Sequence, residues 1–411
     1  MHAIAVDLGT TTLAASLIDL ESGKRLAISG SMNPQRRYGA DVVSRLDAAV
    51  KSDDVLQDLS ALIRTELLRL AHELCKKCGI TWSEVKQVAI AGNPAMQHLL
   101  MGLPVRSLAF PPYRPVHTTG TRLIASALNW DGEAQVYVFP MPGGFVGGDT
   151  VAFLYGATPG NATLCLDMGT NGEMALIMGE TIWSSSAAAG PAFEGGNLSC
   201  GMAALPGAIS SVHIENEQIK LKIIGNVLPE GICGSAAIET VSELLQHDIL
   251  EAGGRLRGNA EIPTNLAARI INHDAASAFV LYRDAQRQLL LTQNDIRQIQ
   301  LAKGAIRAGM EVLAEHARIR YQDLRDVLLT GSFGAVLQPE WLKSIGIFDK
   351  GMVHITRFIP EGSLNGVEQA LITNDEFYSV ERLGERFRVL PLSGTPLFET
   401  MFMRHIDFPH Q

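Results

Sequence analysis

Residues 3–13 read AIAVDLGTTTL, and residues 163–173 read TLCLDMGTNGE. Three positions are identical at one constant spacing: Asp7 and Asp167, Gly9 and Gly169, and Thr10 and Thr170. Each copy follows an apolar run typical of a buried strand, and each leads into a second apolar run. The repeat therefore predicts a duplicated α/β fold with one strand–turn–strand hairpin in each half.

The rest of the chain mixes strand and helix patterns. A reversal at residues 21–24 follows the first hairpin, and the second hairpin turns at Gly179-Glu180. Apolar spacing predicts helices over 59–78 and 293–313, and short apolar runs predict strands over 85–91, 136–139 and 327–330. With 411 residues the chain is long enough for two lobes, which we expect at residues 1–157 and 158–411.

Composition excludes several classes of protein. The chain is 46% hydrophobic and 19% charged, and its net charge of −9 argues against binding to nucleic acid. It contains no run of about 18 apolar residues that could span a membrane, and its first residues do not resemble a secretory signal. Five cysteines are too few for a disulfide framework. We therefore expect a cytoplasmic protein.

An Asp-x-Gly-Thr turn after a strand suits phosphate and magnesium. The glycine lets backbone N–H groups approach an anion, the threonine hydroxyl adds a donor, and the carboxylate is suited to Mg²⁺ rather than to phosphate. Two such loops facing each other could hold the β- and γ-phosphates of one nucleotide. For either loop alone an ordinary β-turn is the alternative, since these residues are common in turns. The P-loop and dinucleotide-binding glycine patterns do not occur in the chain.

Further motifs run in order along nearly the whole chain. They lie at residues 6–12, 33–42, 145–149, 167–173, 188–196, 231–235, 300–303 and 330–334. Together these segments resemble the ATPase region of the reductive activators of corrinoid proteins. The resemblance implies duplicated ribonuclease-H-like lobes of the actin/Hsp70/sugar-kinase (ASKHA) type with a nucleotide cleft between the lobes. It also implies an ATPase, a homodimer through the second lobe, and a corrinoid protein as partner, whose inactive Co(II) form is returned to Co(I).

The same resemblance assigns roles to individual residues. Asp7 and Asp167 would hold Mg²⁺, and Asp149 and Glu173 would orient the attacking water as further catalytic residues. The residues expected at the phosphates of ATP are Gly9, Thr10, Thr11, Thr12, Gly169, Thr170 and Asn171. The residues expected to pack against the adenosine are Gly331, Ser332, Phe333 and Gly334.

The sequence departs from this family in its redox centre. The phosphate loop begins at Asp7, and no C-x₄-C-x₂-C run occurs. We therefore expect no iron–sulfur cluster in this chain, and we expect a separate low-potential electron donor. Two alternatives therefore stay open. One is a regulatory or chaperone-like nucleotide-binding module without a redox role. The other is a small-molecule kinase on the same fold, which added metabolites would stimulate.

One cysteine pair and one lysine could carry chemistry outside these motifs. Cys75 and Cys78 follow His72 on a predicted helix, and Lys76 and Lys77 would lower the pKa of both thiols. A cluster shared between two copies is one interpretation, but Cys75 continues an apolar stripe, which favours a structural role. Lys303 could reach a nucleotide from its helix, although a solvated lysine is the commoner case.

Overall fold

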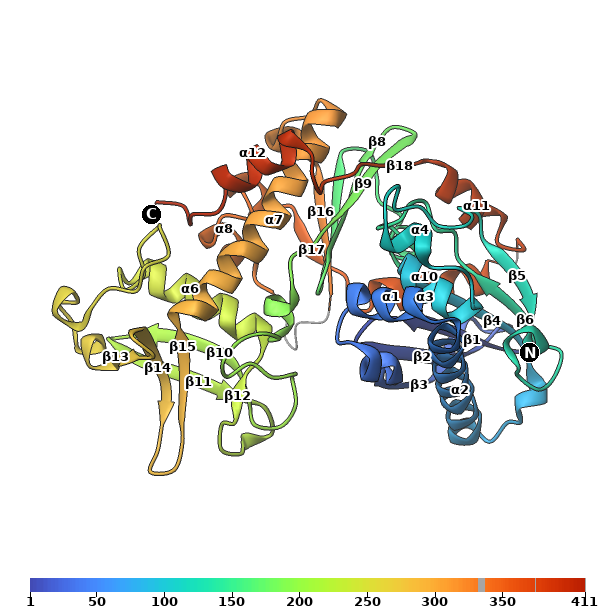
Figure 1. Ribbon diagram of the computed structural model, residues 1–411, viewed down its shortest axis with the longest axis horizontal. Coiled ribbons are helices and arrows are strands. Elements are labelled where there is room, and N and C mark those ends of the chain that lie inside the picture. Colours follow the sequence, from blue (N-terminus) through green and yellow to red (C-terminus); the bar gives the residue numbers. More distant parts are fainter. Residues whose placement is uncertain (332–336, 374, 411) are drawn as a thin grey trace. The chain divides into compact units, whose positions relative to one another are not determined.

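The computed structural model describes residues 1–331, 337–373 and 375–410 (Figure 1). The chain forms two compact units. The first comprises Met1–Gly160, Ile177–Ser184 and Glu361–Val389, and the second comprises Asn161–Leu176, Ser185–Pro360 and Leu390–Gln411. Both units mix helices and sheets, as the sequence predicts.

The first unit contains seven strands and seven helices within the described residues. Its strands are β1 (His2–Leu8), β2 (Thr12–Asp19), β3 (Lys24–Met32), β4 (Val85–Gly92), β5 (Thr121–Ile124), β6 (Gln135–Val138) and β18 (Phe387–Val389). Its helices are α1 (Val42–Lys51), α2 (Asp53–Cys78), α3 (Pro94–Met101), α4 (Arg106–Ala109), α5 (Gly148–Ala157), α10 (Gly362–Ile372) and α11 (Tyr378–Glu385).

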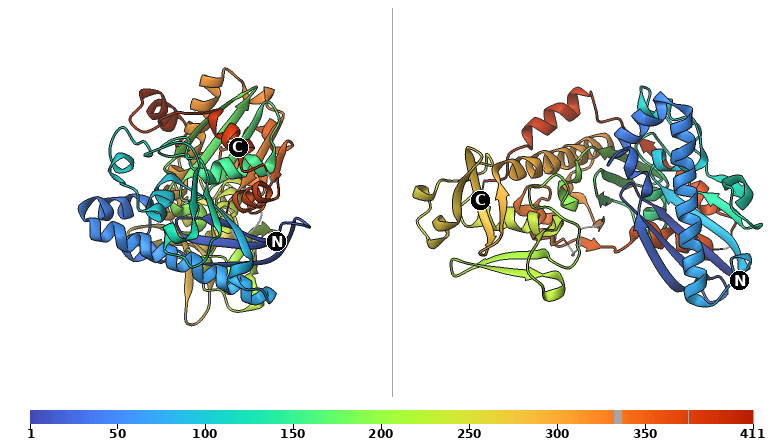
Figure 2. Two further views of the ribbon diagram at one scale, coloured as in Figure 1. Left: turned by 90° about the vertical axis from the view of Figure 1, so that its right-hand side faces the viewer. Right: turned by 60° about the horizontal axis from the view of Figure 1, so that its bottom comes forward.

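A six-stranded sheet in the order β3-β2-β1-β4-β6-β5 forms the centre of this unit. Strands β1, β4 and β6 are parallel, so their carboxyl ends lie at one edge of the sheet. Ligand sites of α/β sheets commonly lie at such an edge. Helix α2 lies along one face of the sheet (Figures 1 and 2), and α5 and α10 pack against each other and against the other face.

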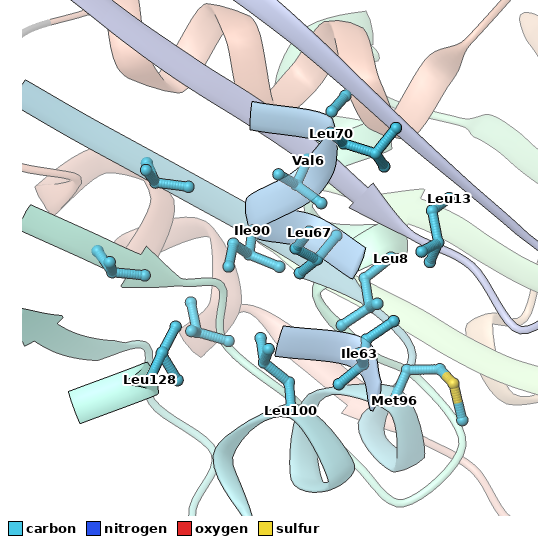
Figure 3. Packing of buried hydrophobic residues seen from close by; sticks show 14 of the residues in the cluster. Val6, Leu8, Leu13, Ile63, Leu67, Leu70, Ile90, Met96, Leu100 and Leu128 are labelled. Carbon is cyan, nitrogen blue, oxygen red and sulfur yellow. The ribbon is translucent and has the colours of Figure 1, made fainter. Parts of the chain in front are cut away.

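Apolar residues of β1, β2 and β4 pack against α2 and α3 to form the main core of the first unit. Val6, Leu8 and Ile90 point from the sheet toward Ile63 and Leu67 of α2 (Figure 3). These side chains are at most 3% exposed, which fixes the register of β1 and hence the position of the loop after it. The core therefore positions the first Asp-x-Gly-Thr loop.

The second unit, with the hairpin that leads out of it, contains the remaining elements. Its strands are β7 (Thr163–Met168), β8 (Gly172–Met178), β9 (Thr181–Ala187), β10 (Ala208–Glu215), β11 (Gln218–Ile223), β12 (Gly231–Ile232), β13 (Ile270–His273), β14 (Ala276–Arg283), β15 (Gln288–Thr292), β16 (Asp326–Thr330) and β17 (Thr356–Phe358). Its helices are α6 (Gly234–Gln246), α7 (Gln293–Ala317), α8 (Pro339–Ser344), α9 (Lys350–Val353) and α12 (Pro396–Arg404).

Strand β16 lies between β17 and β7, and the three strands are parallel. Strand β7 leads through the second Asp-x-Gly-Thr loop into its neighbour β8, and β9 follows β8, as β1 leads into β2 and β3 in the first unit. Helix α12 packs against one side of the long helix α7 (Figure 1). The register places Thr330 of β16 opposite Asp167 of β7, so Gly331, directly after β16, lies at the same edge of the sheet as the second loop.

The predicted elements are confirmed, with shifts at their ends. Helix α2 ends at Cys78, where Gly79 takes the left-handed conformation, but it begins six residues before the predicted start at Leu59. The helix predicted over 293–313 extends to Ala317. Neither long helix, nor any other helix within residues 1–331, 337–373 and 375–410, is long and apolar enough to cross a bilayer.

Candidate nucleotide-binding site

Two hydrogen bonds from Asn33 hold the first Asp-x-Gly-Thr loop in place. The side-chain amide of Asn33 donates to the carbonyl oxygen of Gly9 at 2.9 Å, and its backbone N–H donates to the carbonyl oxygen of Thr11 at 2.9 Å. A Cβ at Gly9 would lie 2.4 Å from the carbonyl oxygen of Thr12, so the tight turn requires glycine. The side chains of Thr11 and Thr12 are exposed at the tip of this loop.

Asn93 connects the same loop to helix α3. Its amide nitrogen donates to the hydroxyl oxygen of Thr10 at 2.9 Å, while its carbonyl oxygen accepts from the N–H of Met96 at 3.0 Å and caps α3. Pro94 follows at the first position of the helix, where a missing N–H costs nothing. Because Asn93 comes directly after β4, it lies at the same edge of the sheet as the end of β1.

Asp7 and Asp149 are close enough to interact electrostatically. Burial and the negative charge of Asp149 raise the pKa of Asp7 from 3.8 to about 7, against the lowering effect of a 3.2 Å hydrogen bond from the Ser363 hydroxyl. Burial also raises the pKa of Asp149 to about 6, although the N–H of Thr150 donates to it at 2.7 Å. Both residues retain some exposed surface. The structure thus brings together two of the predicted site residues.

Tight glycine packing places Asp149 beside β4. A Cβ at Gly147 would lie 2.4 Å from the carbonyl oxygen of Gly92, and a Cβ at Gly148 would lie 2.5 Å from the Cβ of Phe139. The buried amide of Gln97 accepts from the N–H of Gly148 at 3.1 Å and donates to the Phe139 carbonyl at 2.8 Å. These contacts fix the start of α5, and Asp149 lies in its first turn.

The donor set of the first unit fits a magnesium ion. Asp7, Asp149 and the hydroxyl of Ser363 supply hard oxygen ligands, which Mg²⁺ prefers. Two adjacent carboxyls with raised pKa values are stabilised as anions by a nearby cation. When bound, the ion would neutralise charge on the phosphates. Asp7 and Asp149 are the residues of this unit that would hold it.

The second loop follows β7 in the other unit. Gly169 donates its N–H to the carbonyl oxygen of Asn171 at 2.9 Å and closes the turn after Asp167. Gly331 follows β16 at the same edge of the sheet, with a φ of 137° that favours glycine. The other predicted adenosine residues, Ser332, Phe333 and Gly334, lie outside the described residues.

A carboxylate that the sequence reasoning did not select touches the second loop. The hydroxyl of Thr170 donates to Oε2 of Glu194, and a Cβ at Gly169 would lie 3.5 Å from Oε1 of the same group. Burial raises the pKa of Glu194, against the opposing effect of the Thr170 hydrogen bonds. The predicted Glu173 lies on β8, where its Oε1 accepts from the Ser186 hydroxyl at 3.2 Å.

The position of Glu194 is set by the backbone around it. Gly195 ends a 3₁₀ turn over Pro191–Glu194 with a φ of 82°. A Cβ at Gly234, the first residue of α6, would lie 1.7 Å from the carbonyl oxygen of Phe193 and 3.0 Å from the nitrogen of Glu194. The segment Pro191–Glu194 therefore packs between the start of α6 and the second loop, and this packing keeps the Glu194 carboxylate in contact with Thr170.

Four residues at these loops had no role assigned from sequence: Asn33, Asn93, Glu194 and Ser363. Asn33 and Glu194 lie in two of the motifs that carry the family resemblance, but their residue types alone do not indicate a contact with a loop. Asn93-Pro94 after an apolar strand is a recognisable helix start, which could have placed Asn93 at the sheet edge. No sequence signal marks Ser363, which reaches Asp7 from a distant helix.

The structural role favoured for Cys75 agrees with its burial, whereas the expected lowering of its thiol pKa and the expected solvation of Lys303 are wrong. Cys75 is only 3% exposed within the core, and burial, with the neighbouring Cys78, raises the pKa of its thiol rather than lowering it. Lys76 and Lys77 point away from this core, as their exposure shows. Lys303 is not solvated: it is 1% exposed, and its ammonium group donates to the carbonyl oxygen of Asp407.

Comparison with known proteins places the chain in a family. The profile of the RACo middle region matches residues 2–158, and the profile of the C-terminal domain of RACo, the ASKHA domain, matches residues 161–411. The corrinoid activation enzyme RamQ of Eubacterium limosum is 29% identical over 99% of this chain and 70% of RamQ. The [Co(II) methylated amine-specific corrinoid protein] reductase of Methanosarcina barkeri is 26% identical over 84% of this chain and 65% of that protein.

A solved structure gives the same result. A reductive activator for corrinoid,iron-sulfur protein matches with a TM-score of 0.88 and 28% identity, over 100% of this chain and 66% of that chain. This chain thus spans between 65% and 70% of the length of these relatives. The predicted ASKHA fold and the family resemblance are confirmed, and the chain belongs to the RACo family, with the middle region at residues 2–158 and the ASKHA domain at residues 161–411.

Proposed function

We propose that this chain binds and hydrolyses MgATP and couples hydrolysis to the reduction of a corrinoid protein. The names of three relatives support the corrinoid part, since they describe activation or reduction of corrinoid proteins. The observation that carries the ATPase part is the Asp7–Asp149 pair beside a backbone loop, in a chain of the RACo family. A magnesium nucleotide would relieve the repulsion between these carboxyls.

In this proposal the two loops bind the phosphates of one nucleotide, and the lobes comprise residues 1–157 and 158–411. Asp7 and Asp167 hold the magnesium shell, and Asp149 joins them. Backbone N–H groups and threonine hydroxyls of both loops take the phosphate oxygens. Gly331 packs against the adenosine.

Hydrolysis needs a group that orients water and accepts a proton. Water attacks the γ-phosphorus, the bond to the ADP oxygen breaks, and ADP, inorganic phosphate and one proton are released. Asp149 and Glu173 are the candidates from sequence. Glu194 is a third, and its contact with Thr170 favours it because the carboxylate lies against the loop that would hold the phosphates. Its raised pKa brings it nearer to the range of a useful base.

In this proposal the electron for the reduction comes from a separate donor. One electron from a low-potential centre outside residues 1–411 reduces Co(II) to Co(I) in the partner, while ATP hydrolysis supplies the free energy. We further propose a cytoplasmic homodimer.

The test is an ATPase assay with and without a Co(II) corrinoid protein, in the presence of Ti(III) citrate as reductant. We expect slow basal hydrolysis, acceleration by the corrinoid protein, and an ATP-dependent change from the Co(II) to the Co(I) absorption spectrum. Hydrolysis without any effect on the cobalt spectrum would overturn the corrinoid part alone. Absence of both ATP binding and hydrolysis would overturn the whole proposal.

A further inference from the structure

A cavity of about 940 Å³ lies in the second unit, among elements other than the two loops. Helix α7, the carboxyl ends of α6, α8 and α12, and the C-terminal segment after α12 form its walls. Its volume is in the range of sites for small molecules. The residues with formal charge that line it are Lys303, Arg307, Lys343, Lys350, Arg404, Asp349 and Asp407.

Arg307, which lines one wall of this cavity, has its positive charge balanced by neighbouring carboxylates. Arg307 donates to the carbonyl oxygen of Ile347 at 3.0 Å and forms ion pairs with Glu311 at 2.8 Å and Asp349 at 3.1 Å. Its guanidinium also stacks over the ring of Tyr321, with 4.5 Å to the centroid. Two carboxylates therefore balance the charge of this cation, which accounts for its burial.

The other cations have no such compensation. No carboxylate oxygen within the described residues lies within 4.0 Å of the side-chain nitrogens of Lys303, Lys343, Lys350 or Arg404. Lysine and arginine at helix ends also counter the helix dipole, which explains Lys343 and Arg404 in part. It does not explain Lys303, which lies in the middle of α7.

Lys303 is the residue that points to a ligand. Its side chain is 1% exposed, yet its ammonium group has one carbonyl acceptor, that of Asp407, and the ring of Phe408 at 5.3 Å. An ammonium group has three donors, and burying a charge without a counter-ion is costly. Burial and the charge of Arg307 lower its pKa to about 8, although the negative charge of Asp407, which is not within ion-pair distance, raises it. The charge of Lys303 faces a cavity that Lys343, Lys350 and Arg404 also line.

We propose that this cavity binds a small multiply charged anion, either phosphorylated or a polycarboxylate, with Lys303 at its base and Lys343, Lys350 and Arg404 at its rim. The anion would pair with the ammonium group of Lys303 and complete its hydrogen bonding. The C-terminal segment forms part of this wall, held by Phe408, whose N–H donates to the carbonyl oxygen of Ala252 at 2.8 Å. Binding there would therefore also stabilise the C-terminal segment.

The test uses the full chain and isothermal titration calorimetry, with citrate and with pyrophosphate as separate probes. The double variant Lys343→Gln/Lys350→Gln removes two exposed rim charges. The matched control Lys220→Gln/Lys222→Gln removes two exposed charges from β11 in the same unit. We expect saturable binding of at least one probe by the wild type, a weakening of roughly tenfold in the rim variant, and a change of less than about twofold in the control. Binding of one probe alone identifies the chemical class.

Three outcomes would overturn the proposal. The first is that neither probe binds, and the second is an equal weakening in both double variants, which would show non-specific attraction. The third is unchanged binding in the rim variant, which would place the anion elsewhere, for example at the phosphate loops. Lys303→Met serves as a second measurement at the base of the cavity. If it folds, with an unchanged circular dichroism spectrum, it must also weaken binding.

Discussion

Burial, together with the negative charge of Asp149 in the first turn of α5, raises the pKa of Asp7 at the end of β1. Asp7 is therefore a carboxyl that the folded apoprotein prefers to keep protonated, with a pKa of about 7 against 3.8 for the free group. Between these two pH values the folded state holds a proton that the unfolded state has released. The free energy of unfolding therefore falls as pH rises through this window.

We accordingly expect Asp7→Asn to stabilise the nucleotide-free protein at pH 8 by about 2 kcal/mol, with little difference at pH 4.5. Thermal melts of wild type and variant across this range provide the measurement. Asp131→Asn, an exposed aspartate of the same unit, is the control. A variant that is less stable than wild type at pH 8 would show that Asp7 is not held in a repulsive environment.

The carboxylate against the second loop gives a prediction about catalysis. Glu194→Gln keeps the shape of the side chain and can still accept from Thr170, but it removes the negative charge. We expect ATP hydrolysis to fall at least tenfold, while the Kd for MgADP changes by less than about threefold. Glu173→Gln is the comparison, because that residue pairs with Ser186 instead. A greater loss in Glu173→Gln would identify Glu173 as the important carboxylate.

Asn93 allows folding and ligand binding to be separated. Serine caps a helix about as well as asparagine does, so Asn93→Ser keeps the cap of α3 but loses the hydrogen bond to Thr10. We expect the free energy of unfolding to change by less than about 1 kcal/mol, and the KM for ATP to rise roughly fivefold. Asn93→Ala, which removes both contacts, should in addition lower stability by about 1 kcal/mol. Equal ATP affinity in all three proteins would show that Thr10 needs no support.

The two loops match in sequence but not in their steric environment. A Cβ at Gly9 meets the Thr12 carbonyl at 2.4 Å, whereas a Cβ at Gly169 meets nothing closer than 3.5 Å. Gly9→Ala must therefore displace backbone, and we expect it to lower stability by roughly 2 kcal/mol or more and to weaken nucleotide binding. Gly169→Ala should fold with wild-type stability to within about 1 kcal/mol. Denaturation curves of both variants test this, and equal destabilisation would contradict it.

The fold could be predicted because its signals are local or repeated. The apolar periods of β1, β4 and α2 are strong, and the paired Asp-x-Gly-Thr stretches identify the duplication without knowledge of any long-range contact. The element ends were less accurate. The start of α2 at Asp53 lies in a polar stretch whose helical period is weak, so the apolar pattern alone begins at Leu59.

The contacts of the site could not be predicted in the same way. Ser363 reaches Asp7 from α10, and Glu194 reaches Thr170 from a 3₁₀ turn, and neither pairing leaves a periodic trace in the sequence. The burial of Lys303 was missed for a related reason. A lysine in a helix is usually solvated, and only the return of the C-terminal segment across α7 covers this one.

The cysteine pair gives the last prediction. Cys75 lies in the core between α2 and the sheet, whereas Cys78 is partly exposed at the end of the helix. Cys75→Ser would place a hydroxyl group in apolar surroundings, and we expect it to lower the free energy of unfolding by about 1–2 kcal/mol. Cys78→Ser should change it by less than about 0.5 kcal/mol. Urea denaturation measures both values, and metal analysis of anaerobically purified protein accompanies it. Iron that copurifies with the wild type and is lost in both variants would show instead that the two thiols bind a metal.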